Sequence, residues 1–119
     1  MMKRILYVED NPDTANAVKI ILDNSGFNVD LALNGGEGLK KISDSKYDLI
    51  LLDVMLPDMS GWDIYGKVKS KVGAKFAFLS AIPVSSDRME QLRKEGVSDY
   101  ITKPFAKADL IERIKKIFV

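Results

Sequence analysis

The chain of 119 residues contains neither cysteine nor histidine. Without cysteine it can form no disulfide bond and use no thiolate nucleophile. Without histidine it can build no Ser-His triad, imidazole base or histidine-ligated metal site. Any chemistry in this chain must therefore come from carboxylates, hydroxyls, lysines or a metal ion that is bound through oxygen.

Long apolar runs and a strong excess of charge are also missing. No apolar run approaches the roughly 20 residues that a transmembrane helix needs, and the N-terminal stretch does not resemble a signal peptide. Eighteen basic against 17 acidic residues leave a net charge of +1, which gives no reason to expect binding to nucleic acid or to a membrane. We expect a cytoplasmic protein with a single domain over residues 1–119.

Short apolar runs alternate with longer segments of helical periodicity. Strands are predicted at residues 4–8, 27–33, 49–52, 76–79 and 99–101. Helices are predicted from residue 12 to a stop at Gly26, at 36–43, from about residue 60, at 86–95 with a stop at Gly96, and at the C-terminal end. Because parallel strands need crossover connections, these repeats predict an α/β fold: one doubly wound, five-stranded parallel sheet with five helices.

Apolar residues at helical spacing should attach these helices to the sheet. The fourth helix offers little beyond Met89 and Leu92, so we expect it to be the most weakly attached. Asn11 and the pair Ser60 and Asp63 are expected as N-terminal caps. The other residues expected to face inward are Thr14, Val18, Ile21, Leu22, Leu39, Ile42, Leu110, Ile111, Ile114, Ile117 and Phe118, together with some of Trp62, Tyr65, Val68 and Val72.

Polar residues stand at the carboxyl ends of four predicted strands. They are Glu9 and Asp10 after the first strand, Asp53 after the third, Ser80 after the fourth and Lys103 after the fifth. Open α/β sheets bind ligands at this rim. The sequence therefore predicts one site built from these five residues.

Electrostatics indicate what such a site needs. Carboxylates about 5 Å apart repel each other by roughly 3 kcal/mol per pair at an effective dielectric constant of 20, so three ionised together require a cation. A set of oxygen ligands favours Mg²⁺, with Mn²⁺ as an alternative. Lys103 adds a positive charge suited to phosphoryl oxygens, and Ser80 adds a hydroxyl donor. Together they predict phosphoryl transfer to a carboxylate nucleophile.

Four segments resemble the receiver domain of response regulators in two-component signalling. They are YVEDN at 7–11, LLDVMLPDMSG at 51–61, FLSA at 78–81 and DYITKPF at 99–105, and the resemblance spans the whole chain. It implies the flavodoxin-like strand order 2-1-3-4-5, in which the first and third strands are neighbours. Glu9 and Asp10 would then lie beside Asp53.

The resemblance also implies a role for each site residue. Asp53 would accept a phosphoryl group from the phosphohistidine of a sensor histidine kinase or a phosphotransfer protein. Glu9, Asp10, Asp53 and the backbone carbonyl of Met55 would hold Mg²⁺. Lys103 would balance the phosphoryl charge. The domain would not be a turnover enzyme, because it would catalyse only its own phosphorylation and dephosphorylation.

The resemblance also implies roles for four residues near the ends of the fourth and fifth strands. Ser80 would donate to a phosphoryl oxygen, and Tyr100 matches the aromatic switch residue that turns inward. Ala81 is small, as access to the site requires, and Pro104 matches a proline that follows a cis peptide bond. We expect the fourth helix, fifth strand and fifth helix to form a face that meets a downstream protein. The chain would act as a monomer or as a phosphorylation-dependent dimer.

Each residue taken singly also has a simpler structural interpretation. Glu9 and Asp10 could cap the first helix, and Ser80 could be a turn residue. Lys103 could be a solvated loop residue, and Tyr100 could be part of the core. Asp53 has no such role, because an acid at the end of a fully apolar strand has no evident structural function.

Other classes of protein fit the sequence less well. A phosphatase with an aspartate nucleophile needs a second acid two residues later, where this chain has Met55. The GxxxxGK[ST] and GxGxxG motifs of nucleotide-binding proteins are absent. A receiver-like module that binds a partner without phosphorylation stays an alternative. Basic residues of the last helix are expected to form a solvated face, not a nucleic-acid site: Lys107, Arg113, Lys115 and Lys116.

Overall fold

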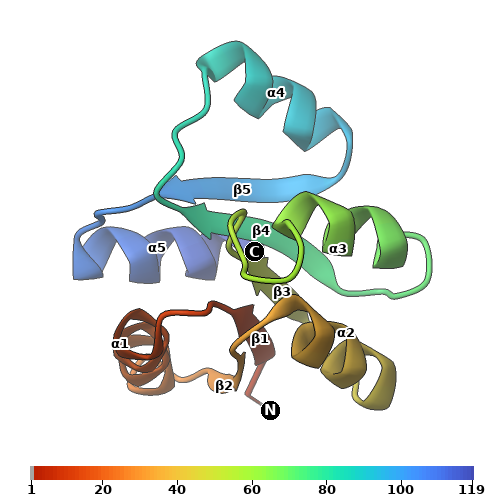
Figure 1. Ribbon diagram of the computed structural model, residues 1–119. Coiled ribbons are helices and arrows are strands. Elements are labelled where there is room, and N and C mark those ends of the chain that lie inside the picture. The colour runs from red at the N-terminus through yellow and green to blue at the C-terminus, as the bar shows by residue number, and fades with distance from the viewer. Residues whose placement is uncertain (1) are drawn as a thin grey trace.

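The computed structural model describes residues 2–119 and has an α/β fold (Figure 1). The elements are β1 (Arg4–Val8), α1 (Pro12–Asp23), β2 (Asn28–Ala32), α2 (Gly35–Asp44), β3 (Leu49–Leu52), α3 (Gly61–Val68), β4 (Lys75–Ser80), α4 (Ser86–Lys94), β5 (Val97–Thr102) and α5 (Lys107–Ile117). All strand pairs are parallel, in the order β2-β1-β3-β4-β5. The predicted fold class and strand order are confirmed. None of the helices within residues 2–119 has the length and apolar character needed to cross a membrane.

Helices cover both faces of the sheet, as Figure 1 shows. Helices α1 and α5 pack on one face, where the core includes Tyr7, Leu22 and Ile114. Helices α2, α3 and α4 pack on the other face, where it includes Leu52 and Ile64. Because β3 lies between both layers, its four residues are all buried, which explains its uninterrupted aliphatic sequence.

The predicted helix boundaries agree with the structure to within a few residues. The Asn11 side chain accepts hydrogen bonds from the first turn of α1, and Ser60 with Asp63 forms a complete capping box at α3. Gly26 and Gly96 follow α1 and α4 with positive φ angles of 94° and 105°. These are the two glycine stops that the sequence predicted.

The expected inward residues are all buried or half-buried, but the prediction missed Ala15 and Ile64. In α1 the buried residues are Ala15, Val18 and Leu22, and Thr14 is half-buried. Ala15 was missed because a small alanine contributes little to a hydrophobic pattern. In α3 Ile64 is fully buried and Trp62 is half-buried. Val72 lies beyond the end of α3 and packs against the core from the following loop.

Strand β5 is longer than predicted. It begins at Val97, which pairs with Phe76, and an irregularity in the register leaves Ser98 as an extra residue before Asp99 pairs with Ala77. Ser98 and Asp99 interrupt the apolar pattern, so the first residues of this strand could not be recognised from hydrophobicity.

Strand β2 lies at an edge of the sheet, and side chains of the flanking helices form hydrogen bonds with its backbone. Lys19 donates to the carbonyl of Val29 at 2.6 Å, and Asp23 accepts from the Val29 N–H at 3.2 Å. Lys41 donates to the carbonyl of Leu31. Free backbone groups on an edge strand invite pairing with another chain. These contacts therefore protect the edge against strand addition.

We predict that Lys41→Met weakens this protection. It removes a charged donor from the Leu31 carbonyl, so the free energy of unfolding should fall by about 1 kcal/mol, and the protein should self-associate at high concentration. Urea unfolding and analytical ultracentrifugation measure the two effects. Lys40→Met is the matched control, because within residues 2–119 Lys40 pairs only with Asp44, at 3.0 Å, on the same helix. Equal behaviour of the two variants would contradict the prediction.

Candidate functional site

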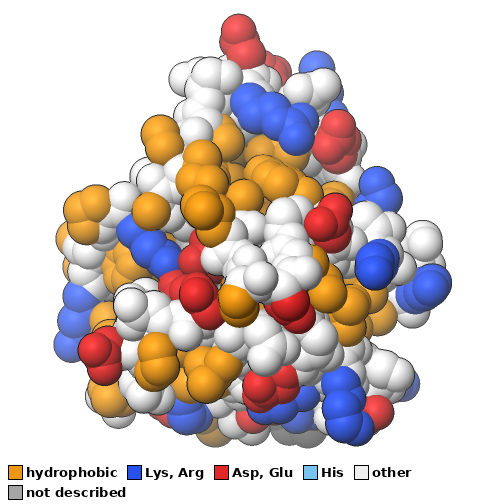
Figure 2. All heavy atoms as spheres, in the orientation of Figure 1, with side chains coloured by type: hydrophobic (Ala, Val, Ile, Leu, Met, Phe, Trp, Pro, Cys, Tyr) orange, Lys and Arg blue, Asp and Glu red, His pale blue; other side chains and the backbone are white. Residues whose placement is uncertain are grey.

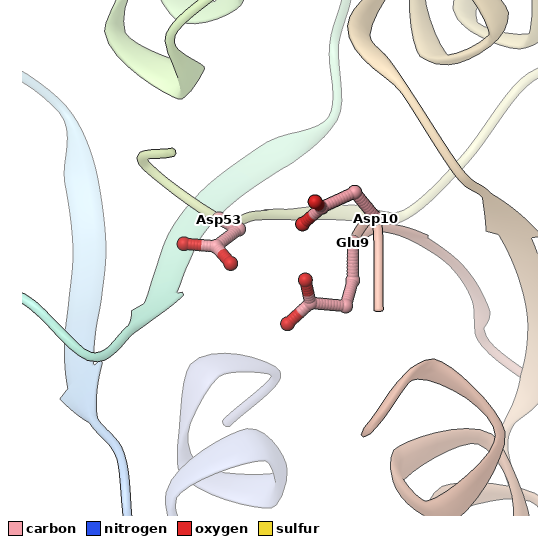
Figure 3. A group of neighbouring side chains, drawn as sticks. All are labelled: Glu9, Asp10 and Asp53. Carbon is pink, nitrogen blue, oxygen red and sulfur yellow. The ribbon is translucent and has the colours of Figure 1, made fainter. Parts of the chain in front are cut away.

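Three acidic residues meet at the carboxyl end of the sheet. Carboxylate oxygens of Glu9, Asp10 and Asp53 all lie within 4.8 Å of one another (Figure 3). The register of β1 and β3 brings them together, because Val8 is paired with Leu52 and the Asp53 N–H donates to the Val8 carbonyl at 3.0 Å. Residues that directly follow the two neighbouring strands therefore lie side by side.

Lys103 supplies the positive charge beside this cluster. Its ammonium group donates to Glu9 and also lies 3.2 Å from Asp53 Oδ2. Glu9 and Asp53 are buried, with 2% and 7% of their surfaces exposed, while Asp10 is exposed. Burial raises the pKa of Asp53; Lys103 opposes this rise and Glu9 adds to it. The peptide bond from Lys103 to Pro104 is cis, as the receiver resemblance implied.

Two further groups hold Glu9, and sequence reasoning missed both. The Tyr7 hydroxyl donates to Glu9 Oε1 at 3.3 Å, and the Asn11 N–H donates to Glu9 Oε2 at 3.2 Å. Burial raises the pKa of Tyr7 far above its usual value, and the charges of Glu9 and Asp53 raise it further, so the hydroxyl stays protonated. The available signal was strand alternation, since residues 7 and 9 share one face of the sheet.

Ser80 and Tyr100 meet at the backbone of Ile82. The Ser80 hydroxyl oxygen accepts from the Ile82 N–H at 3.3 Å, and the Tyr100 hydroxyl donates to the Ile82 carbonyl. Ser80 is 1% exposed and Tyr100 is 4% exposed, so the tyrosine side chain points inward. Ser80 also joins the acidic cluster indirectly, since the Lys103 N–H donates to the Ser80 carbonyl at 2.8 Å.

The loop after Asp53 is fixed by its backbone. The Met55 N–H donates to Asp53 Oδ1 at 3.3 Å, and Met55 and Ser60 form an antiparallel bridge. The Gly61 N–H donates to the Val54 carbonyl at 2.8 Å. A Cβ atom on Gly61 would lie 2.1 Å from the Asp53 carbonyl oxygen, so only glycine allows this close approach. The Met55 side chain contributes little, because it is 68% exposed.

Asp58 ties the tip of the same loop to helix α2. Its two carboxylate oxygens accept from the N–H groups of Gly35 and Gly36, each at 2.8 Å. These donors belong to the first turn of α2 and have no partner within the helix. This contact could not be predicted from the sequence, because Asp58 is more than twenty residues away from its donors.

Helix α4 contributes few buried residues to the core. Of its residues, all within the described part of the chain, only Leu92 is buried. Near its N-terminal end the Arg88 guanidinium lies 5.5 Å from the ring of Trp62, which in turn stacks on Tyr100 at 6.2 Å. At its C-terminal end the Tyr65 hydroxyl donates to the Glu95 carbonyl at 2.8 Å. The predicted weak attachment of the fourth helix agrees with this packing.

Arg113 joins α5 to β5, so the expectation of a solvated face is wrong for this residue. It donates to both carboxylate oxygens of the buried Asp99, at 2.8 and 2.7 Å, and to the Tyr100 carbonyl at 3.0 Å. The helical pattern of the sequence had placed Arg113 near the polar side of α5, which is why a solvated position was expected. The acidic partner on the neighbouring strand draws Arg113 inward. Lys107, Lys115 and Lys116 are exposed as expected.

A family model described as the response regulator receiver domain matches residues 5–115. The transcriptional regulatory protein DltR of Streptococcus agalactiae is 40% identical over 113 residues, which cover 94% of this chain and 50% of DltR. CusR of Escherichia coli is 39% identical over 115 residues, which cover 96% of this chain and 50% of CusR. The chain spans about half the length of these two relatives. It belongs to the response regulator receiver domain family.

Solved structures agree with this assignment. The response regulator TrrA of Thermotoga maritima, in complex with Mg²⁺-BeF, has a TM-score of 0.82 and 37% identity, covering 98% of this chain and 99% of TrrA. A CheY-like receiver domain protein of Methanospirillum hungatei has a TM-score of 0.85 and 35% identity, covering 98% of this chain and 93% of that one. The receiver fold thus extends over nearly all of this chain.

We predict that the contact between Asp58 and α2 is lost in acid. The N–H groups of Gly35 and Gly36 hold the pKa of Asp58 below its usual value of 3.8. A pKa lowered by folding adds stability above pH 3.8, and this contribution disappears as the pH falls through the lowered pKa. The amide signals of Gly35 and Gly36 in NMR spectra should therefore shift with a midpoint below pH 3.8.

Asp58→Asn is the matched control for this titration. The amide side chain keeps the size of the carboxylate but does not titrate, so the same two signals should stay constant over this pH range. A midpoint at or above pH 3.8 in the wild type, or an unchanged titration in the variant, would contradict the assignment.

Proposed function

We propose that the whole chain, residues 1–119, is a phosphoacceptor domain of the cytoplasm. Asp53 receives a phosphoryl group from the phosphohistidine of a sensor histidine kinase or phosphotransfer protein, in a Mg²⁺-dependent reaction. The observation that carries this proposal is the meeting of Glu9, Asp10 and Asp53 within 4.8 Å, with the Lys103 ammonium group against two of these carboxylates. A structural role alone does not explain three acids gathered at one point.

The donor atoms of this cluster fit a hard divalent cation. Mg²⁺ is bound by one or two carboxylates together with water and phosphate oxygens, and Mn²⁺ accepts the same ligands. Glu9, Asp10 and Asp53 would provide the carboxylates, and the receiver pattern adds the backbone carbonyl of Met55. When bound, Mg²⁺ supplies positive charge to the oxygens of the transferred group. TrrA, which was solved with Mg²⁺-BeF, supports this choice of ion.

The residues of the chain supply the rest of the chemistry. A carboxylate oxygen of Asp53 attacks phosphorus, an O–P bond forms, and the P–N bond to the donor imidazole breaks with its electron pair left on nitrogen. Lys103 is 3.2 Å from Asp53 Oδ2, so its charge lies next to the phosphoryl group that forms there. Ser80 can donate its hydroxyl proton to a phosphoryl oxygen, because its contact with Ile82 uses only the oxygen as acceptor.

Two alternative functions make different predictions. A phosphatase with repeated turnover needs a second carboxylate for the acid and base step, and the position two residues after Asp53 carries the exposed, apolar Met55. A receiver-like module that only binds a partner does not need the acid cluster or Lys103. In the proposed function the domain catalyses its own phosphorylation and dephosphorylation, and it does not process a separate substrate.

We predict that incubation with Mg²⁺ and a small-molecule phosphodonor adds one phosphoryl group to the wild type. Intact mass spectrometry measures the addition. Asp53→Asn and Asp53→Ala should gain no mass, because both lack the nucleophilic carboxylate. Chelation of the metal should also prevent the addition. An unmodified wild type would support the interaction module, and continued release of phosphate would support the phosphatase.

The signal leaves the domain through the face formed by α4, β5 and α5. Ser80 contacts the N–H of Ile82 and Tyr100 contacts its carbonyl, two groups joined at one Cα atom, so a shift of the Ser80 hydroxyl toward a phosphoryl group acts through the Ile82 backbone on the contact of Tyr100. Tyr100 stacks on Trp62, which lies against Arg88 of the weakly attached α4. The downstream partner is a protein, and this domain itself contacts neither nucleic acid nor a membrane. It acts as a monomer or as a phosphorylation-dependent dimer.

We predict that phosphorylation, or addition of Mg²⁺ with beryllofluoride, shifts the amide signals of residues 85–100 in NMR spectra. Trp62 is the only tryptophan of the sequence, so its fluorescence should change at the same time. Asp53→Ala serves as the control and should show neither change. Unshifted signals in a wild type that carries the phosphoryl group would exclude this face as the output surface.

A further inference from the structure

Tyr7 stands out in the interior of β1 as a fully buried residue with a polar group. Its ring belongs to the core beneath α1 and α5, and its exposed fraction is 0%. The neighbouring core residues of this strand are Ile5, Leu6 and Val8, all aliphatic. A phenylalanine would fill the same space without the cost of burying a hydroxyl. Packing therefore does not explain why position 7 carries a hydroxyl group.

The partner of the hydroxyl explains its presence. Within residues 2–119 the Tyr7 side chain makes a single hydrogen bond, to Glu9 Oε1 at 3.3 Å. Glu9 lies two residues further along the chain, where strand alternation returns to the same face of the sheet. Because Glu9 is itself only 2% exposed, little water is available to orient its carboxylate. Protein donors must do so.

The three donors to Glu9 differ in how firmly they are held. Asn11 contacts the second oxygen, Oε2, through its backbone N–H. Lys103 and Tyr7 both contact Oε1, but Lys103 also contacts Asp53 and carries the charge that a phosphoryl group would attract. Tyr7 lies on a strand that is paired on both sides. When Lys103 turns toward the phosphoryl group, Tyr7 is the donor that still holds Oε1.

We propose that Tyr7 is a positioning residue, which holds the Glu9 carboxylate in the orientation needed to bind Mg²⁺ beside Asp53. The proposal rests on the proposed function, because Glu9 has to be a ligand of the metal. Hydrogen bonds to the ligands of a metal set their orientation, and removing one weakens metal binding roughly 10–100-fold. Tyr7 does not itself touch the metal or the phosphoryl group.

Tyr7→Phe tests the proposal, because it removes the hydroxyl and keeps the ring. Isothermal titration calorimetry with MgCl₂ should give a dissociation constant about 10-fold higher than that of the wild type. Tyr47→Phe is the matched control, since the Tyr47 hydroxyl donates to the carboxylate of Asp30 at 2.8 Å outside the acidic cluster. Its Mg²⁺ affinity should equal that of the wild type. An unchanged affinity in Tyr7→Phe, or an equal loss in both variants, would overturn the proposal.

A double-mutant cycle separates positioning from a general effect on folding. If Tyr7 acts through Glu9, the change Tyr7→Phe should weaken Mg²⁺ binding in the wild type and cause no further loss in a Glu9→Gln background. Equal losses in both backgrounds would assign Tyr7 a purely structural role, whatever its effect on the unfolding midpoint. A wild type that binds no Mg²⁺ would overturn the metal site of the proposed function together with this inference. A wild type that binds Mg²⁺ as tightly as Tyr7→Phe would overturn this inference alone.

Discussion

The parallel register of β1 and β3 is the constraint on which the rest of the site depends. Val8 pairs with Leu52, so the residues that directly follow them, Glu9 and Asp53, lie side by side at the ends of the two strands. The register is fixed because all residues of β3 are buried between two layers of helices, so a slip by one position would bury Asp53 in the core and expose a leucine. Burial of aliphatic side chains thus determines where the carboxylates meet.

Once the carboxylates are together, charge determines the rest of the arrangement. Burial raises the pKa of Asp53 and the charge of Glu9 raises it further, while Lys103 opposes part of this rise from the end of β5. The lysine comes from the opposite half of the sheet, so the site forms only when all the strands are in place. Hydrogen bonds also fix the loop after Asp53. Its own backbone makes some of them, and the Asp58 carboxylate accepts others from the first turn of α2.

The residues that the sequence predicted and those it missed differ in a physical way. Glu9, Asp10, Asp53, Ser80 and Lys103 follow apolar strands, and the ends of parallel strands meet at one rim whatever the details of packing. Tyr7 was missed because a tyrosine within an apolar strand resembles any other core residue. Asp58 and the pair Asp99 and Arg113 were missed because their partners are distant in the sequence, and only the tertiary structure brings them together.

In the proposed function, the backbone of Ile82 carries a small chemical change to a distant surface. Its N–H and its carbonyl contact two different side chains, Ser80 on the side of the proposed phosphoacceptor and Tyr100 near α4. If the Ser80 hydroxyl turns toward a phosphoryl oxygen, its hydrogen bond to the Ile82 N–H changes. Because the N–H and the carbonyl of Ile82 belong to consecutive peptide planes joined at one Cα atom, a change in the backbone angles of Ile82 then alters the contact of the carbonyl with Tyr100. Leu92 is the one buried residue of α4 within the described part of the chain, so this helix belongs to the elements that such a change moves most readily. The proposed function therefore requires both the rigid strands around Asp53 and a loosely attached helix that these contacts can reach.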